Sequence, residues 1–199
     1  MITIELIMAL VTYYFVMYIT PGPNNTMLTA SGIRFGFVRT VPHLIGIPTG
    51  HALQLTLVCL GLGALFEQYA FIQDTLKWIG SAYLIYLSWK IFGSLKLGSK
   101  NTGKPLKFFE AIIFQFVNPK AWVICITATS LFFPREENRY LAIVFLVLFS
   151  YLINLPCISC WALFGTGIKN LLKKVIIKRA VEWLMAILLA LTAISILIG

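Results

Sequence analysis

Three long stretches without a charged residue most constrain how this chain can fold. They cover residues 6–33, 41–65 and 140–164, and an α-helix needs about 20 apolar residues, at about 1.5 Å rise per residue, to cross a bilayer. Three further apolar stretches lie at residues 75–92, 111–133 and 183–199. The pattern predicts an all-α integral membrane protein of about six transmembrane helices.

The overall composition also argues against a soluble protein. The 199 residues are 59% hydrophobic and 12% charged, with a mean hydropathy of +0.88, whereas soluble domains contain about 25% charged residues. The net charge of +9 does not indicate nucleic-acid binding, because the basic residues lie in short gaps between the apolar stretches. The N-terminal stretch carries Glu5 and no preceding basic residue, so we interpret it as a span and not as a signal peptide.

The distribution of the basic residues predicts the orientation of the chain. Cytoplasmic loops of membrane proteins carry an excess of Lys and Arg. Most basic residues here follow the first, third and fifth spans: Arg34 and Arg39; Lys90, Lys96, Lys100, Lys104 and Lys107; and Lys169, Lys173, Lys174, Lys178 and Arg179. We therefore expect these loops in the cytoplasm and both termini outside.

The chain divides at one clear linker. Residues 95–107 are rich in Gly, Ser, Asn, Pro and Lys, and we expect a single transmembrane domain, 1–199, whose halves 1–94 and 108–199 are joined there. Prolines interrupt the first and fourth spans at corresponding places. Because each half has three spans, the second half must enter the membrane upside down. The sequence thus predicts a 3+3 inverted repeat with interrupted helices one and four, as in many secondary transporters.

The interruption of the first span is the sequence Thr20-Pro21-Gly22-Pro23-Asn24-Asn25. The prolines remove backbone donors and the glycine between them tolerates unusual dihedral angles, so we expect two half-helices with Thr20 or Asn24 capping the second. The alternative is a simple packing kink. Broken backbone at membrane depth persists only inside protein or beside water, and the free amides of a half-helix attract anions such as a carboxylate. This segment is a candidate substrate-binding site.

The fourth span has a similar interruption at Asn118-Pro119-Lys120. We expect Asn118 to cap the second half-helix and Pro119 to occupy its first position. Lys120 lies deep in an apolar stretch, where a charge is costly and normally faces the interior of the bundle. Lys120 is therefore a candidate partner for a substrate carboxylate or a gating charge, and the alternative is that it extends to the nearer interface.

The second span supplies packing and coupling candidates. Gly46 and Gly50 are spaced so that another helix can approach closely. His51 follows them and could relay protons, or could equally be a packed neutral histidine. No acidic residue lies deep in a span, and Glu110, at the start of the fourth, is the nearest candidate for proton coupling.

Two alternative functions stay open on sequence grounds. Cys157 and Cys160 have the CxxC spacing of thiol redox centres, although cysteine is also a small apolar residue suited to helix packing. A cation or metal efflux protein is the other alternative, but no His, Cys, Asp and Glu cluster has metal-ligand spacing. We also find no nucleophile paired with a base, so neither an enzyme nor a cofactor is expected.

Four of these motifs, in this order, carry a family resemblance. They are Pro21-Gly22-Pro23-Asn24, the glycine-rich second span, the third-span sequence Leu76 to Leu87 (LKWIGSAYLIYL), and Asn118-Pro119-Lys120. Together they resemble the LysE/RhtB family of amino-acid exporters. The resemblance implies efflux of amino acids or related small metabolites from the cytoplasm, driven by the proton-motive force, in a bacterial inner membrane. Pro48 and His51 depart from the family's pattern.

The expected partners follow from this interpretation. They are a small-molecule substrate and membrane lipid, and no nucleic acid. A bundle of 199 residues is small, and a second copy would help to bury a water-filled site away from lipid, so we keep a homodimer as a hypothesis. The sequence does not specify which amino acid is carried.

Overall fold

A computed structural model describes residues 2–62, 68–91, 105–134 and 138–198. These residues form helices joined by short connections, with no strand in the described ranges. Residues 95–104 of the predicted linker lie outside them, and residues 105–107 are non-helical. The elements are α1 (Ile4–Ile19), α2 (Pro23–Phe35), α3 (Phe37–Leu57), η1 (Val58–Leu62), α5 (Ala70–Ile91), α6 (Phe108–Val117), α7 (Pro119–Phe132), α8 (Arg139–Ile168), η2 (Leu171–Lys173) and α9 (Val175–Ile198).

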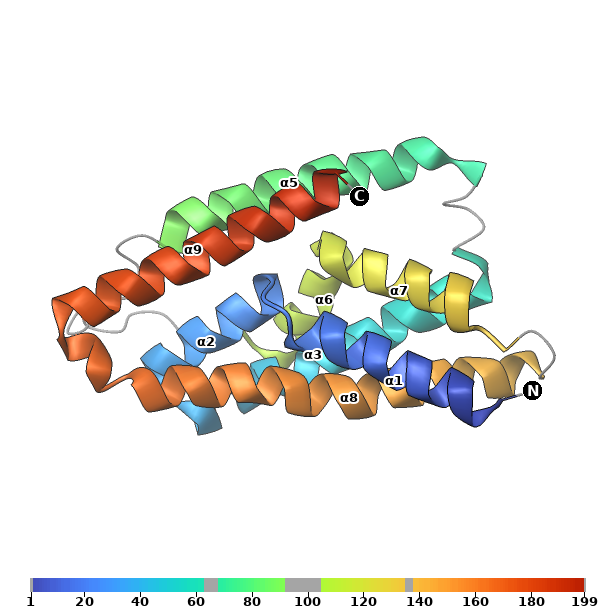
Figure 1. Ribbon diagram of the computed structural model, residues 1–199, viewed down its shortest axis with the longest axis horizontal. Coiled ribbons are helices and arrows are strands. Elements are labelled where there is room, and N and C mark those ends of the chain that lie inside the picture. Colours follow the sequence, from blue (N-terminus) through green and yellow to red (C-terminus); the bar gives the residue numbers. More distant parts are fainter. Residues whose placement is uncertain (1, 63–67, 92–104, 135–137, 199) are drawn as a thin grey trace.

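These helices confirm an all-α membrane protein of about six spans. In the described part of the chain, α3 with η1, α8 and α9 are each long and apolar enough to cross a membrane. The pairs α1 with α2 and α6 with α7 meet the same criterion as bent spans. Helix α5, the predicted third span, has 22 residues but carries Asp74, Lys77 and Lys90. It lies along α9 (Figure 1).

The outer surface of the bundle is suited to lipid. Along α8, the side chains of Leu141, Val144, Leu148 and Leu152 are exposed at the spacing of one helix face. The opposite face of α8 is buried and includes polar side chains such as Ser150. An apolar exterior around a partly polar interior is expected of a protein that is solvated by lipid.

Both predicted interruptions are present. α1 and α2 meet at 52°, and α6 and α7 meet at 71°. Each second half-helix begins with a proline, Pro23 or Pro119, whose missing N–H costs nothing at that position. Asn118 caps α7 as predicted, because its side chain accepts from the backbone N–H of Lys120 at 3.2 Å.

The predicted cap of α2 was wrong. Neither Thr20 nor Asn24 caps it; the N-cap residue is Gly22, and no side chain bonds to the first turn. The Thr20 hydroxyl instead donates to the Met17 carbonyl at 3.1 Å, at the end of α1. The next asparagine, Asn25, donates to two carbonyls of that same end.

Small residues bring the first span into close contact with α8. A Cβ on Gly165 would collide with the backbone oxygen of Thr29, and one on Gly32 would collide with the backbone oxygen of Ala162. The hydroxyl of Thr29 donates to the Trp161 carbonyl at 3.3 Å. Since Tyr18 of α1 also bonds to Ser150 of α8 at 2.6 Å, the whole first span runs parallel to α8.

The fourth span makes the matching contact with α3. A Cβ on Gly46 would lie 2.5 Å from the Phe108 oxygen, and one on Gly50 would lie 2.7 Å from the Ile112 Cα. Gly46 and Gly50 thus meet α6, which runs parallel to α3. Span one with five, and span four with two, are the pairings that a 3+3 inverted repeat relates to each other.

The third and sixth spans form an antiparallel pair, seen along the top of Figure 1. Ser81 donates to the Ala193 carbonyl at 3.3 Å, and Ser88 donates to the Ala186 carbonyl at 2.8 Å. Each helix of the pair also touches one interruption. A Cβ on Gly80 would collide with the ring of Pro119, and Thr192 donates to the Pro21 carbonyl at 3.3 Å.

Candidate functional site

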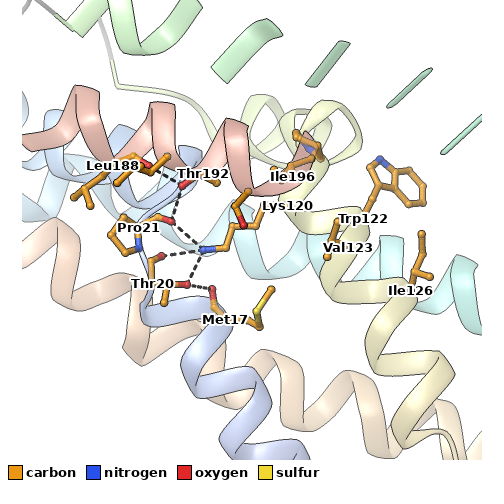
Figure 2. A pocket seen from close by; sticks show the side chains of 13 residues that line it. Met17, Thr20, Pro21, Lys120, Trp122, Val123, Ile126, Leu188, Thr192 and Ile196 are labelled. Atoms are coloured by element: carbon orange, nitrogen blue, oxygen red, sulfur yellow. Dashed lines mark hydrogen bonds between the residues drawn. The ribbon is translucent and has the colours of Figure 1, made fainter. Parts of the chain in front are cut away.

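The two interruptions meet at the side chain of Lys120 (Figure 2). Its ammonium nitrogen donates to the Thr20 carbonyl at 3.0 Å, to the Thr20 hydroxyl at 2.8 Å and to the Pro21 carbonyl at 3.1 Å. These three acceptors match the three N–H groups of the ammonium. Lys120 therefore points into the bundle toward the first span, and does not extend to an interface.

The sequence places Lys120 there through local features at both interruptions. Lys120 follows Pro119 at the start of α7, so the change of direction between α6 and α7 aims its side chain at the first span. Gly22 leaves room for the lysine stem, since a Cβ at this position would lie 3.0 Å from Cδ and 3.3 Å from Nζ of Lys120. The broken helix exposes the carbonyls that the lysine binds.

A second contact between the interruptions is a pair of amide side chains. Asn24 donates to the Gln115 side-chain oxygen at 2.9 Å, and Gln115 donates back to the Asn24 oxygen at 3.2 Å. Gln115 is fully buried and also donates to the Ala111 carbonyl at 3.0 Å. The amide pair fixes α2 against α6.

A cavity of about 720 Å³ opens beside Lys120. Its polar groups are few and lie near the interruptions, among them Thr20, Lys120 and Thr192. Figure 2 shows Lys120 and Thr192 on opposite sides of the Pro21 carbonyl. The rest of the lining is apolar: Met17, Pro21, Pro119, Trp122, Val123, Ile126, Leu188, Leu191 and Ile196, with the hydroxyl of Ser195. Such a cavity suits a small molecule with one anionic group and an uncharged remainder.

A second, much smaller cavity also lies beside the interruptions. Its volume is about 30 Å³, and it is lined by residues of the first span, α3, α7 and α8. Lys120 and Met17 line both cavities. The lining of the small cavity also includes predicted site residues, namely Gly22, Pro23, Asn24, Asn118 and His51.

His51 and Glu110, the two coupling candidates, lie in different surroundings. His51 is 2% exposed, and its ring lies edge-on to that of Tyr18 with centroids 5.4 Å apart. The Cys125 sulfur is 3.8 Å from each ring nitrogen. Glu110 is exposed at the start of α6, where its carboxylate accepts from the Lys107 N–H at 2.8 Å. The structure brings His51 to the site and leaves Glu110 outside it.

The two CxxC cysteines differ in exposure and lie outside both cavities. Both thiols are free; Cys157 is buried, whereas Cys160 is exposed and donates to the Pro156 carbonyl of its own helix at 3.4 Å. Neither lines the two cavities described above. In the described ranges, no group of three or more His, Cys, Asp and Glu side chains is arranged to hold a metal ion.

Sequence reasoning missed several amide and hydroxyl side chains at or beside the site. They are the buried Gln54, Gln115 and Asn154 and the half-buried Thr192. Asparagine and glutamine are costly to bury without partners, so their presence inside the apolar stretches is the signal that would have indicated all three amides.

Comparisons with known proteins agree with this architecture. A family model described as "LysE type translocator" matches residues 15–199. The chain is 30% identical over 197 residues to a cysteine/O-acetylserine efflux protein of Klebsiella pneumoniae subsp. pneumoniae, covering 98% of this chain and 99% of that protein. It is 29% identical over 197 residues to the protein of the same name from Escherichia coli strain K12, covering 98% of each. No solved structure matches the chain significantly.

Proposed function

The chain belongs to the LysE type translocator family, and from that membership we propose that it exports neutral amino acids from the cytoplasm. Members of such a family are transporters and not enzymes, and the apolar helices make this one a multi-pass protein of the inner membrane. Relatives are named for efflux of cysteine and O-acetylserine, both of which are small amino acids with uncharged side chains. We extend that substrate class to this chain.

The position of Lys120 is the observation that most directly supports the proposal. It is the one basic residue predicted deep within a span, and its ammonium joins the two interruptions at the edge of the 720 Å³ cavity. An amino acid always brings a carboxylate, which forms charge-assisted hydrogen bonds with a lysine. The substrate carboxylate would replace one of the Thr20 or Pro21 acceptors, and the uncharged side chain would occupy the apolar part of the cavity.

Export requires that the site open to each side in turn. We propose that the two halves are inverted repeats, which would rock against each other about the two interruptions. Coupling to the proton-motive force is part of the proposal, with His51 as the group placed nearest the site. The basic loops would face the cytoplasm and both termini the outside. A metal or cation efflux protein is less well supported, because the ammonium of Lys120 repels cations from the cavity.

Export from intact cells tests this proposal. Cells expressing the chain are loaded with a mixture of amino acids supplied as peptides, and the amino acids that appear outside are measured. We expect selective export of small neutral amino acids, abolished in Lys120→Met and by a protonophore. Lys174→Met, which removes an exposed lysine of the loop before α9, is the matched control and should export normally.

Three results would count against the proposal. Equal release from cells with and without the chain would exclude amino-acid export. Selective release of lysine or arginine would exclude the neutral substrate class. Export that continues after the proton gradient is collapsed would exclude proton coupling and leave the rest intact.

A further inference from the structure

Two buried asparagines that line the small cavity each have a carboxamide oxygen without a hydrogen-bond partner. The residues are Asn25 in α2 and Asn154 in α8, which are 4% and 2% exposed. Both line the 30 Å³ cavity, and neither side-chain oxygen has a hydrogen-bond partner among the described residues. A buried polar atom left in this way destabilises a protein, so two at one cavity indicate a missing donor.

The orientation of the Asn25 side chain is fixed by its neighbours. Its amide nitrogen donates to the Tyr18 carbonyl at 2.9 Å and to the Thr20 carbonyl at 2.7 Å. These two bonds use both N–H groups of the carboxamide. The oxygen must then point away from the end of α1, and it can only be satisfied by a donor from elsewhere.

The size of the cavity limits what that donor can be. About 10–15 Å³ of such space holds one water-sized group, so a cavity of about 30 Å³ admits about two such groups, enough for an ammonium group and not for a whole amino acid. Two carboxamide oxygens accept hydrogen bonds and do not donate them. The occupant must therefore be compact and must offer either hydrogen-bond donors, as a water or an alkylammonium group does, or a positive charge, as a metal cation does.

The charge of Lys120 favours the ammonium group of a zwitterion over a free cation as the occupant. Lys120 lines this cavity as well as the larger one. A cation in the small cavity would therefore be repelled by the ammonium of Lys120. A lone cation would meet that repulsion in full. In an amino-acid zwitterion, the carboxylate lies beside the ammonium and can pair with Lys120, which offsets the repulsion.

We propose that Asn25 and Asn154 form the subsite for the α-ammonium group of the substrate. This inference rests on the proposed function, because it takes the substrate to be an amino acid whose carboxylate binds Lys120. The ammonium enters the small cavity and donates to the two carboxamide oxygens. The side chain of the substrate extends into the 720 Å³ cavity, and the transporter thus selects free amino acids over carboxylic acids that lack the amino group.

Competition in everted membrane vesicles tests the subsite. Uptake of radiolabelled L-cysteine is measured under reducing conditions, with two competitors that each keep half of the zwitterion: cysteamine has the ammonium only, and 3-mercaptopropionate has the carboxylate only. In Asn154→Leu, which keeps the branching of the side chain and removes the acceptor, we expect competition by cysteamine to weaken about tenfold or more. Competition by 3-mercaptopropionate should be unchanged.

Two further variants serve as controls. Asn154→Asp keeps an acceptor and adds a negative charge, so it should bind cysteamine at least as tightly as the parent and bind 3-mercaptopropionate less tightly. Ser159→Ala lies on the same helix and removes only a bond to the Leu155 carbonyl. Both competitors should therefore inhibit cysteine uptake by this variant as they do in the parent. If Asn154→Leu does not reach the membrane, the opposite shifts in Asn154→Asp still test the subsite.

The outcomes separate the inference from the proposed function. If the parent vesicles take up no cysteine or other neutral amino acid, the proposed function is wrong and the subsite falls with it. If they take up cysteine, but substitution of Asn154 weakens competition by both compounds equally or by neither compound, only the ammonium subsite is wrong. Uptake that requires sodium and is unaffected by cysteamine would assign the two oxygens to a metal cation instead.

Discussion

Asn24 and Gln115 exchange hydrogen bonds in both directions, at 2.9 Å and 3.2 Å, and so join the interrupted spans of the two halves. Each amide satisfies the other inside the bundle. Removing one leaves its partner with an unsatisfied donor and acceptor, which costs more than the bond itself contributes.

This exchange predicts coupling between substitutions at the two positions. Asn24→Leu and Gln115→Met should each lower the free energy of unfolding in detergent by about 1–3 kcal/mol. The double variant should lose less than the sum, by about 0.5–3 kcal/mol, because no unpaired amide remains. Ser88→Ala, in the separate contact of α5 with α9, combined with Asn24→Leu should be additive. Additivity in the Asn24–Gln115 pair as well would contradict the exchange.

Close packing of α2 on α8 predicts a sharp difference between two glycines of one helix. Gly165→Ala places a methyl group against the Thr29 carbonyl, whereas the same change at Gly167 meets no described atom within 4 Å. Overpacking costs about 1–3 kcal/mol, so Gly165→Ala should lower the melting temperature in detergent. Gly167→Ala should leave it unchanged or raise it slightly, since alanine favours helix. Equal melting temperatures would show that α2 and α8 are not in backbone contact.

Replacing the two CxxC cysteines should not affect export. If transport does not use thiol chemistry, the double variant Cys157→Ser and Cys160→Ser should export amino acids within about twofold of the parent, as is usual for mild substitutions outside a site. Alkylation of the parent should change export no more than alkylation of the double variant. Complete loss of export in the serine variant, with normal insertion in the membrane, would favour a thiol relay.

The charge distribution predicts which residues can be labelled from outside. In a variant without native cysteines, Glu5→Cys and Lys174→Cys each place one thiol at an exposed position. A membrane-impermeant maleimide added to spheroplasts should label position 5, and it should label position 174 only after the membrane is opened. The reverse pattern would invert the proposed orientation.

The sequence predicted those features of the site that depend on local chemistry. Prolines and glycine between residues 20 and 23 interrupt a helix in almost any context, and the same holds for Pro119. A lysine far from both ends of an apolar stretch must face the interior, and Lys120 does. These inferences needed no knowledge of which helices are neighbours.

The remainder depends on contacts between distant parts of the chain. The sequence predicts Thr20 or Asn24 as the cap of α2, but the Thr20 hydroxyl bonds to Met17 and to Lys120, which is one hundred positions later. The pairing of Asn24 with Gln115 and the meeting of Asn25 with Asn154 at one cavity also require the packing of separate spans. No local pattern specifies which residues such packing brings together.

Two of the three acceptors that hold Lys120 are main-chain oxygens, those of Thr20 and Pro21. Substitution changes side chains and leaves the carbonyl of each residue in place. A genetic screen for loss of export should therefore recover changes at position 120 readily, and it should find Pro21 tolerant wherever the replacement preserves the bend. The lysine has partners that point mutation alone cannot delete, so any selection for altered specificity must act on the surrounding side chains.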